Sequence, residues 1–313
     1  MRVRTLGKTG IEISELSLGT WGLSGDGYGH VDEIDKEQVI ERALGLGITC
    51  FETADSYQQG AMERRIGRWL ESHPKAVVIT KIGTDRDLNP PIKRFDEEYL
   101  RAAAAASKER LNRRIDVLLL HNPSHIALAK PHVAETMNAL CADGTARCWG
   151  ASVGSAELGR LAIERGAQVL ELAFNAFHPQ DLAGVVTLAK EKQVGLVGRS
   201  VLAHGLLCGQ WPMGKQFPNG DHRRERWTVD DLKKRIQQLS ALRPSVSGDV
   251  TSLRAAALRF ALSEPALSTV VLGPRSAVQL DQLLRDAGRE PPYLTDDSRA
   301  ALVRRLVNVG ITS

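Results

Sequence analysis

Short runs of apolar and β-branched residues alternate along the chain with longer amphipathic segments. The short runs lie near residues 14–20, 47–52, 76–81, 115–121, 146–152, 168–174, 194–200 and 268–273. Each run is typical of a buried strand, and the segments between them carry the apolar periodicity of helices, most clearly at 100–111. Eight such alternations predict a closed parallel barrel, the (β/α)8 or TIM barrel, rather than an open doubly wound sheet.

The connections between these elements support the barrel. An open sheet is expected to carry a glycine-rich turn that leads directly into its first helix, whereas Gly25, Gly27 and Gly29 are followed by acidic residues and are interpreted as a loop at the barrel mouth. The interval from 205 to about 250 is too long for a plain strand-to-helix loop, and we expect a structured excursion over the mouth.

Single residues and short patterns also indicate where two helices begin and which helices follow the last strand. Asp35 and Ser155 each precede an amphipathic segment and are expected to be N-caps. Helical patterns near 276–287 and 295–307 follow the last strand and would complete the outer ring or close the base of the barrel. The whole chain, 1–313, is therefore expected to be a single domain.

Polar residues that can handle protons follow four of the apolar runs directly. Tyr57 closes the segment after the run at 48–51, Lys81 ends the next run, and His121 and Ser152 end the two after that. Because the carboxyl ends of parallel strands meet at one rim of a barrel, we expect these side chains to lie together at the mouth. Tyr, Lys and His in one site favour carbonyl–alcohol redox chemistry.

Composition narrows the class of protein further. The 313 residues are 42% hydrophobic and 25% charged, with a net charge of +4, which is typical of a globular protein with a sizeable core. The densest basic stretch, 222–226, is interpreted as a solvated loop or a cofactor lid, and no nucleic-acid partner is expected. No signal peptide or membrane span is recognised, so a cytoplasmic location is expected. Cys50 and Cys148 fall in predicted strands as core thiols, and no metal site is expected.

Four segments carry a resemblance to a known family. The opening segment 6–22 resembles the first hairpin and strand of the aldo-keto reductases, and 47–57 resembles their signature, followed at matching spacing by Gly60, Glu63 and Gly67. Segments 115–121 and 270–276 also fit, in the same order. The resemblance covers about residues 3 to 290 and implies a barrel with an N-terminal hairpin and extended loops at its C-terminal face.

Carbonyl reduction requires a hydride donor and an acid that protonates the developing alkoxide. No side chain donates hydride, so a nicotinamide cofactor is implied. An unperturbed Tyr titrates near pH ~10, and a nearby ammonium such as Lys81 is expected to lower that pKa. The resemblance implies that Tyr57 is the acid, Lys81 its tuning partner, Glu52 the carboxylate beside Lys81, and His121 the residue that orients the carbonyl.

The resemblance also implies a cofactor site, with NADPH/NADP+ expected in preference to NADH because Arg275 offers a full charge to a 2′-phosphate, unless it is a solvated surface residue. The residues expected to bind the cofactor are Thr20, Trp21, Ser152, Glu171, Arg199, Ser200, Leu202, Gly205, Gly273, Arg275 and Gln279. The guanidinium of Arg199 would stack on the nicotinamide ring. The substrate is expected to be a small carbonyl compound, which the sequence does not identify further, and the oligomeric state is left open.

Several positions depart from the family pattern, three of them around the nicotinamide and the Tyr57–Lys81 pair. Glu52 replaces the usual Asp, Val153 replaces an Asn, and Glu171 replaces a Gln, the last two at positions that hold the nicotinamide carboxamide in relatives. Glu171 is expected either to accept a hydrogen bond from that carboxamide or to pair with a cation of the barrel. We therefore expect an active reductase, with a cofactor-binding protein of weak or no catalysis, in a sensor or regulatory role, as the alternative.

Overall fold

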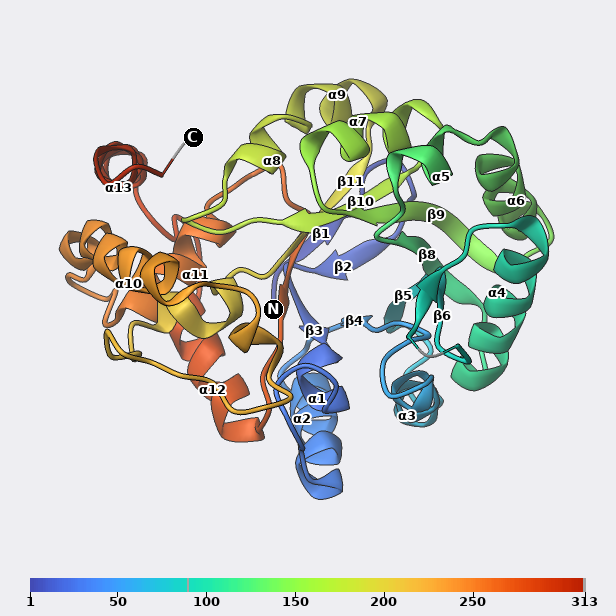
Figure 1. The fold of residues 1–313 in the computed structure, drawn as a ribbon, viewed down its shortest axis with the longest axis horizontal. Coiled ribbons are helices and arrows are strands. Elements are labelled where there is room, and N and C mark those ends of the chain that lie inside the picture. The colour runs from blue at the N-terminus through green and yellow to red at the C-terminus, as the bar shows by residue number, and fades with distance from the viewer. Residues whose placement is uncertain (89, 312–313) are drawn as a thin grey trace.

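The computed structural model describes residues 1–88 and 90–311 and contains a closed barrel of parallel strands (Figure 1). The barrel strands are β3 (Leu16–Gly19), β4 (Cys50–Glu52), β5 (Val77–Ile82), β8 (Ile115–His121), β9 (Ala146–Val153), β10 (Val169–Ala173), β11 (Gly195–Arg199) and β12 (Thr269–Leu272). Around the barrel the order is β10-β11-β12-β3-β4-β5-β8-β9, and pairing of β9 with β10 closes it. Each predicted run therefore contains a strand, and the predicted (β/α)8 barrel is confirmed.

Helices surround the strands, as Figure 1 shows, and lie in the segments whose apolar periodicity predicts them. The longer ones are α2 (Glu33–Gly45), α3 (Ala61–Leu70), α4 (Glu97–Leu111), α6 (Pro131–Ala142), α7 (Ala156–Glu164), α9 (Val186–Lys192), α10 (Val229–Gln238), α11 (Leu253–Leu262), α12 (Ala277–Ala287) and α13 (Asp296–Asn308). Shorter ones are α1 (Trp21–Ser24), α5 (His125–Ala129) and α8 (Gln180–Ala183). None of the helices found in residues 1–88 and 90–311 is long and apolar enough to cross a bilayer.

A hairpin of β1 (Val3–Thr5) and β2 (Glu12–Ser14) covers the end of the barrel where the strands begin, as predicted. Its turn reaches the start of β11, where Lys8 donates its backbone N–H to Gln193 O at 2.8 Å. Leu6 of the hairpin is fully buried in one apolar cluster with Cys50 and Cys148, which confirms both cysteines as core residues. This end is packed shut, so the opposite end is left for a site.

The barrel interior is tight enough to require glycine where β9 meets β10. A Cβ placed on Gly150 would lie 1.9 Å from the backbone oxygen of Val169, so a larger residue would push the two strands apart. This close approach keeps β9 in register with β10, in which Glu171 pairs with Ser152. Two polar residues expected in the site are thereby placed side by side at the mouth.

Two insertions rise above the C-terminal face of the barrel. After β5 the chain forms a small antiparallel hairpin, β6 (Thr84–Asp85) and β7 (Ile92–Lys93). After β11 it forms a segment of short 3₁₀ helices and loop, residues 203–228, which we call the strap.

The strap closes over the loop that follows β3. His222 donates its backbone N–H to Gly27 O at 2.9 Å, and the Tyr28 hydroxyl lies 3.1 Å from His204 Nδ1. Arg223 is salt-bridged to the buried Asp221, and its guanidinium lies over the ring of Tyr28 at 4.9 Å. The predicted excursion over the mouth is therefore confirmed, and its basic stretch is partly packed rather than fully solvated.

Of the two expected N-caps, one is confirmed and one is wrong. The Ser155 side chain accepts a hydrogen bond from Leu158 N at 3.3 Å and caps α7. In α2 the cap position is Asp32, whose backbone is extended, whereas Asp35 lies inside the first turn. An acidic residue is favourable at both places, because the amino end of a helix carries partial positive charge, so residue type alone does not locate the cap.

Candidate active site

A cavity of about 760 Å³ opens at the C-terminal ends of the barrel strands. Its walls include every residue expected to be catalytic or to bind the cofactor except Thr20, namely Trp21, Glu52, Tyr57, Lys81, His121, Ser152, Glu171, Arg199, Ser200, Leu202, Gly205, Gly273, Arg275 and Gln279. Thr20 is fully buried, and its hydroxyl has no hydrogen-bond partner among the described residues. A volume of this size suits a small-molecule or cofactor site.

Lys81 on β5 is the centre of the polar group at the cavity floor. Its ammonium donates to the Tyr57 hydroxyl at 3.2 Å and to the backbone oxygen of Thr53 at 3.0 Å, and it forms an ion pair with Glu52. Lys81 is only 1% exposed, so these contacts replace water around a buried cation. The sequence prediction that Tyr57, Lys81 and Glu52 lie together is therefore confirmed.

Glu52 reaches Lys81 although it is one methylene longer than the usual Asp. The neighbouring strand makes room for it, because a Cβ at Gly19 would lie 3.0 Å from Glu52 Oε2 and 2.5 Å from Val271 Cγ1. The other carboxylate oxygen, Oε1, lies 3.5 Å from the Tyr57 hydroxyl. The longer side chain is thus accommodated by a glycine on β3.

The pKa of Tyr57 is shifted in the direction opposite to the one expected from the sequence. Burial lowers the pKa of Lys81 to about 8, while the carboxylate of Glu171 acts in the opposite direction. Burial, followed by the charge of Glu171, raises the pKa of Tyr57 above its usual value. The expectation that Lys81 leaves Tyr57 with a lowered pKa is wrong here, because desolvation of the phenolate outweighs nearby positive charge.

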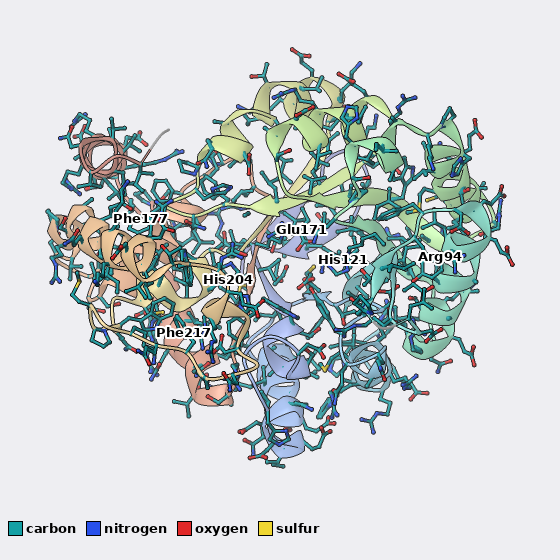
Figure 2. All side chains as sticks on the ribbon, viewed as in Figure 1. Arg94, His121, Glu171, Phe177, His204 and Phe217 are labelled. Atoms are coloured by element: carbon teal, nitrogen blue, oxygen red, sulfur yellow. The ribbon has the colours of Figure 1, made fainter. Side chains whose placement is uncertain are left out.

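His121, at the end of β8, lies beside Tyr57. The two rings meet edge to face with centroids 6.1 Å apart, and His121 Nδ1 lies 3.5 Å from the Ser56 hydroxyl. Burial, with the charges of Lys81 and Lys93, lowers the pKa of His121 well below its usual value, so its imidazole is neutral. Figure 2 shows His121 and Glu171 near the centre of the barrel, with His204 of the strap to one side.

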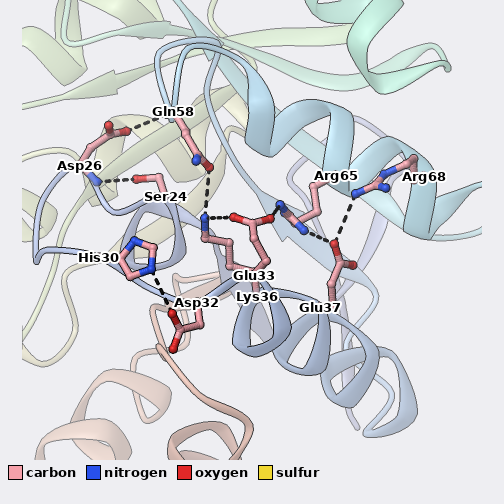
Figure 3. A network of polar contacts seen from close by, with 10 residues as sticks. All are labelled: Ser24, Asp26, His30, Asp32, Glu33, Lys36, Glu37, Gln58, Arg65 and Arg68. Atoms are coloured by element: carbon pink, nitrogen blue, oxygen red, sulfur yellow. Dashed lines mark hydrogen bonds and ion pairs between the residues drawn. The ribbon is translucent and has the colours of Figure 1, made fainter.

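The loop that carries Tyr57 is held by polar contacts with two neighbouring segments. Gln58, the next residue, has a positive φ of 49°, and its backbone N–H donates to Asp26 Oδ2 at 2.7 Å. Lys36 of α2 donates to the Gln58 side-chain oxygen at 3.4 Å and to Glu33 at 2.5 Å (Figure 3). The network joins this loop to α2 and to the loop after β3, so it holds the backbone on which Tyr57 sits.

Among the residues expected around a nicotinamide, Glu171 brings a buried carboxylate. Glu171 is 1% exposed, and its Oε2 lies 3.7 Å from Lys81 Nζ, too far for a hydrogen bond and without another partner in the described chain. Arg199 donates to the backbone oxygen of Val153 at 3.0 Å. Of the two roles expected for Glu171, the ion pair with a barrel cation is therefore present, and one carboxylate oxygen stays available to a donor.

The loop after β11 has a constrained backbone. Ser200, Ala203 and His204 have φ values of 58°, 47° and 60°, a conformation that side-chain-bearing residues adopt infrequently. Such strain is concentrated at ligand sites, where it orients backbone groups. Gly205 follows at φ 96°, and both Ser200 and Gly205 line the cavity.

Arg275 lies at the far end of the cavity, before α12. Its guanidinium donates to the backbone oxygens of Gly29, at 3.1 Å, and His30, at 2.8 Å, and its backbone N–H donates to the Gln279 side chain at 2.9 Å. Arg275 is therefore not a free surface residue. It joins the loop after β3 to the start of α12 and forms no ion pair with a carboxylate in the described part of the chain.

The structure adds cavity residues that the sequence analysis did not single out. They are Asp26, Arg86, Lys93 and Arg226. Asp26 and Arg226 lie in the two segments that the sequence analysis places over the mouth, and Arg86 and Lys93 lie in the β6–β7 hairpin. No local pattern marks them, because their place in the cavity depends on how an irregular segment folds back over the barrel.

A family model for the aldo/keto reductase family matches residues 15–312. The chain belongs to the aldo-keto reductase family. It is 26% identical over 298 residues to aldo-keto reductase YhdN of Bacillus subtilis, covering 92% of this chain and 89% of the relative. It is 29% identical over 312 residues to D-threo-aldose 1-dehydrogenase of a Pseudomonas species, covering 90% and 92%.

The fold comparison agrees. The holo form of aldo-keto reductase AKR11C1 from Bacillus halodurans superimposes with a TM-score of 0.81 at 24% sequence identity, covering 97% of this chain and 96% of that one. This aldo-keto reductase is thus an oxidoreductase, as the sequence predicts.

Proposed function

We propose that this aldo-keto reductase reduces an aldehyde, ketone or sugar carbonyl to an alcohol, with NADPH as the hydride donor. The observation that carries the proposal is the Tyr57 hydroxyl, held 3.2 Å from the Lys81 ammonium at the floor of an open cavity. A phenol can donate its proton, and an ammonium beside it stabilises the phenolate that is left.

In this proposal Tyr57 protonates the oxygen of the carbonyl as the carbon is reduced. Lys81 donates its own hydrogen bond to the Tyr57 oxygen, and the phenol proton, which in the structure has only a long 3.5 Å contact to Glu52 Oε1, would turn to the carbonyl oxygen when a substrate binds. The raised pKa keeps that proton on Tyr57 at neutral pH. The neutral imidazole of His121, beside the Tyr57 ring, is a hydrogen-bond donor that orients the same carbonyl oxygen.

The cavity residues fit a nicotinamide dinucleotide. Bound there, the cofactor would supply the hydride that no side chain can. Glu171 Oε2 is a buried acceptor without a hydrogen-bond partner in the described chain, which suits the amide N–H of a nicotinamide. The strained backbone at Ser200 and the guanidinium of Arg226, which forms no ion pair in the described residues, suit phosphate. We assign the 2′-phosphate of NADPH to Arg275, whose contacts in the structure are backbone carbonyls.

The proposal is tested by NADPH consumption with a panel of aldehydes, ketones and quinones. The Tyr57→Phe variant should lose about 10²- to 10⁴-fold in kcat, the usual contribution of general acid catalysis. Its affinity for NADPH, followed by tryptophan fluorescence, should stay nearly unchanged. Tyr99→Phe, which removes the same hydroxyl on α4, is the matched control and should keep full activity. Near-normal kcat in Tyr57→Phe on a good substrate would show that another group is the acid.

A further inference from the structure

The β6–β7 hairpin places one ammonium group at the edge of the cavity. Lys93 Nζ donates to the Thr84 hydroxyl at 2.6 Å and to the backbone oxygen of His121 at 2.8 Å, and Lys93 is part of the cavity wall. Both acceptors are neutral, and an ammonium has three donor hydrogens. One donor of Lys93 therefore remains for a further acceptor.

The charge of Lys93 is not neutralised by its neighbours. It forms no ion pair with a carboxylate within residues 1–88 and 90–311, whereas the nearby Arg86 lies 3.4 Å from Asp26 Oδ2. Burial lowers the pKa of Lys93 and the carboxyl of Asp55 acts in the opposite direction, but burial and the charge of Glu63 raise the pKa of Asp55 itself to about 8. At pH 7 that carboxyl is mostly protonated, so Lys93 keeps an unbalanced positive charge.

Lys93 lies on the side of the mouth opposite the segments expected to bind the cofactor phosphates. Its hairpin follows β5 and contacts the end of β8, and in the barrel order β5 is four strands from β11 and β8 is four strands from β12. Arg199 and Arg275, at the ends of β11 and β12, are thus across the cavity. The cation beside His121 is separate from those available to the phosphates of a dinucleotide.

The position of the substrate carbonyl determines which part of the substrate lies near Lys93. In the proposed function the carbonyl oxygen lies against Tyr57 and His121, and Lys93 is hydrogen-bonded to the backbone of His121 itself. A substituent of the carbonyl carbon that extends out of the barrel on this side passes the Lys93 ammonium. An anionic substituent would gain a charge-assisted hydrogen bond there, and a neutral one would not.

We propose that Lys93 is a specificity residue that binds an anionic group of the substrate, so that the preferred substrates are aldehydes or ketones carrying a carboxylate or a phosphate. The inference rests on the proposed carbonyl reduction and names its substrate class. The carboxylate and the phosphate share the chemistry that Lys93 recognises, and the test separates them.

Two matched pairs of substrates test the proposal. In each pair only the charge changes: 4-carboxybenzaldehyde against methyl 4-formylbenzoate, and glyceraldehyde 3-phosphate against glyceraldehyde. Wild-type kcat/KM should be at least about tenfold higher for the anionic member of one or both pairs, and the pair that shows the larger ratio identifies the preferred anion. A ratio near one in both pairs would overturn the proposal.

The variants assign any preference to Lys93. Lys93→Gln should lose at least about tenfold in kcat/KM on the preferred anion, mainly through KM, with a much smaller loss on its neutral partner. Lys93→Arg should retain most of the preference. Lys75→Gln removes the same charge at the other end of β5, where Lys75 is exposed, and should leave all four values unchanged.

Other outcomes count against the proposal in distinguishable ways. Equal losses on the charged and neutral members in Lys93→Gln would mean that Lys93 only supports His121, and the proposal would be overturned. If the neutral aldehydes are reduced without any preference for the anions, the substrate class is wrong while the proposed function stands. If no carbonyl compound of either kind is reduced, the proposed function fails, and this inference fails with it.

Discussion

The carboxylate of Glu171 lies 3.7 Å from the ammonium of Lys81, which also forms an ion pair with Glu52. Lys81 therefore sits between two buried acids, of which Glu171 is 1% exposed. Glu171 replaces the Gln that the family resemblance leads one to expect. The second acid keeps the buried ammonium charged, and it also raises the pKa of Tyr57.

Glu171→Gln should lower the pKa of Lys81 below its value of about 8, because the carboxylate that opposes desolvation is removed. A fall of about one unit is the expected scale for losing one nearby charge. The Cε chemical shift of labelled lysine, followed against pH with Lys81→Met to assign the signal, measures it without any cofactor. An unchanged titration would mean that Glu52 alone holds the charge.

The Glu52→Asp variant should have a lower or an unchanged kcat. The space beside Gly19 accommodates the longer carboxylate, and a shortened one would draw away from Lys81. Glu52→Gln keeps the length and removes the charge, so it should lose more activity than Glu52→Asp. Measuring kcat for the three forms on one aldehyde decides the matter. A gain of tenfold or more in the Asp form, about 1.4 kcal/mol of transition-state stabilisation, would indicate instead a chain that has drifted towards cofactor binding.

Arg275→Ala should weaken NADPH binding more than NADH binding. Loss of one charge-assisted contact to the 2′-phosphate costs on the order of 1.5–3 kcal/mol, or roughly 10- to 150-fold in Kd. Arg275 also holds the backbone of Gly29 and His30, so an equal loss for both cofactors would point to that structural role. Fluorescence titration of wild type, Arg275→Ala and Arg275→Lys with each cofactor separates the two. Equal affinity of the wild type for NADH and NADPH would contradict the assignment.

Asp55→Asn should stabilise the protein progressively as the pH rises. The pKa of Asp55 is raised from 3.8 to about 8 by burial, so between these values the folded state holds a proton that the unfolded state has lost. The stability associated with this carboxyl is present below pH ~4 and is lost as the pH rises through about 8. The free energy of unfolding, measured with denaturant, should be compared between the variant and the wild type at pH 5 and at pH 9. The advantage of the variant should be larger at pH 9 by at least about 1.4 kcal/mol.

The exposed loop variant Asp87→Asn is the matched control for this measurement and should show no such trend. A difference between Asp55→Asn and wild type that is the same at every pH would contradict the prediction. The contrast between the two Asp positions isolates burial as the cause.

The order of elements and the meeting of Tyr57, Lys81 and His121 follow from the sequence. Each depends on a local pattern, an apolar run that ends in a polar residue, and parallel strands bring their carboxyl ends to one rim whatever the intervening loops do. The hairpin at the base is expected from the family resemblance, and of the two caps expected from local sequence only Ser155 is confirmed. The replacement of Asp by Glu52 is also visible, though not the space that Gly19 leaves for it.

Only the tertiary structure decided the environment of those residues. Thr20 is withdrawn from the cavity and Arg275 is tied to the loop after β3, because side-chain direction depends on packing rather than on residue type. The pKa of Tyr57 is raised because burial and a charge from another strand outweigh its Lys neighbour. Lys93 lies 28 residues before His121 and reaches it from the β6–β7 hairpin, whose position depends on contacts with the folded barrel.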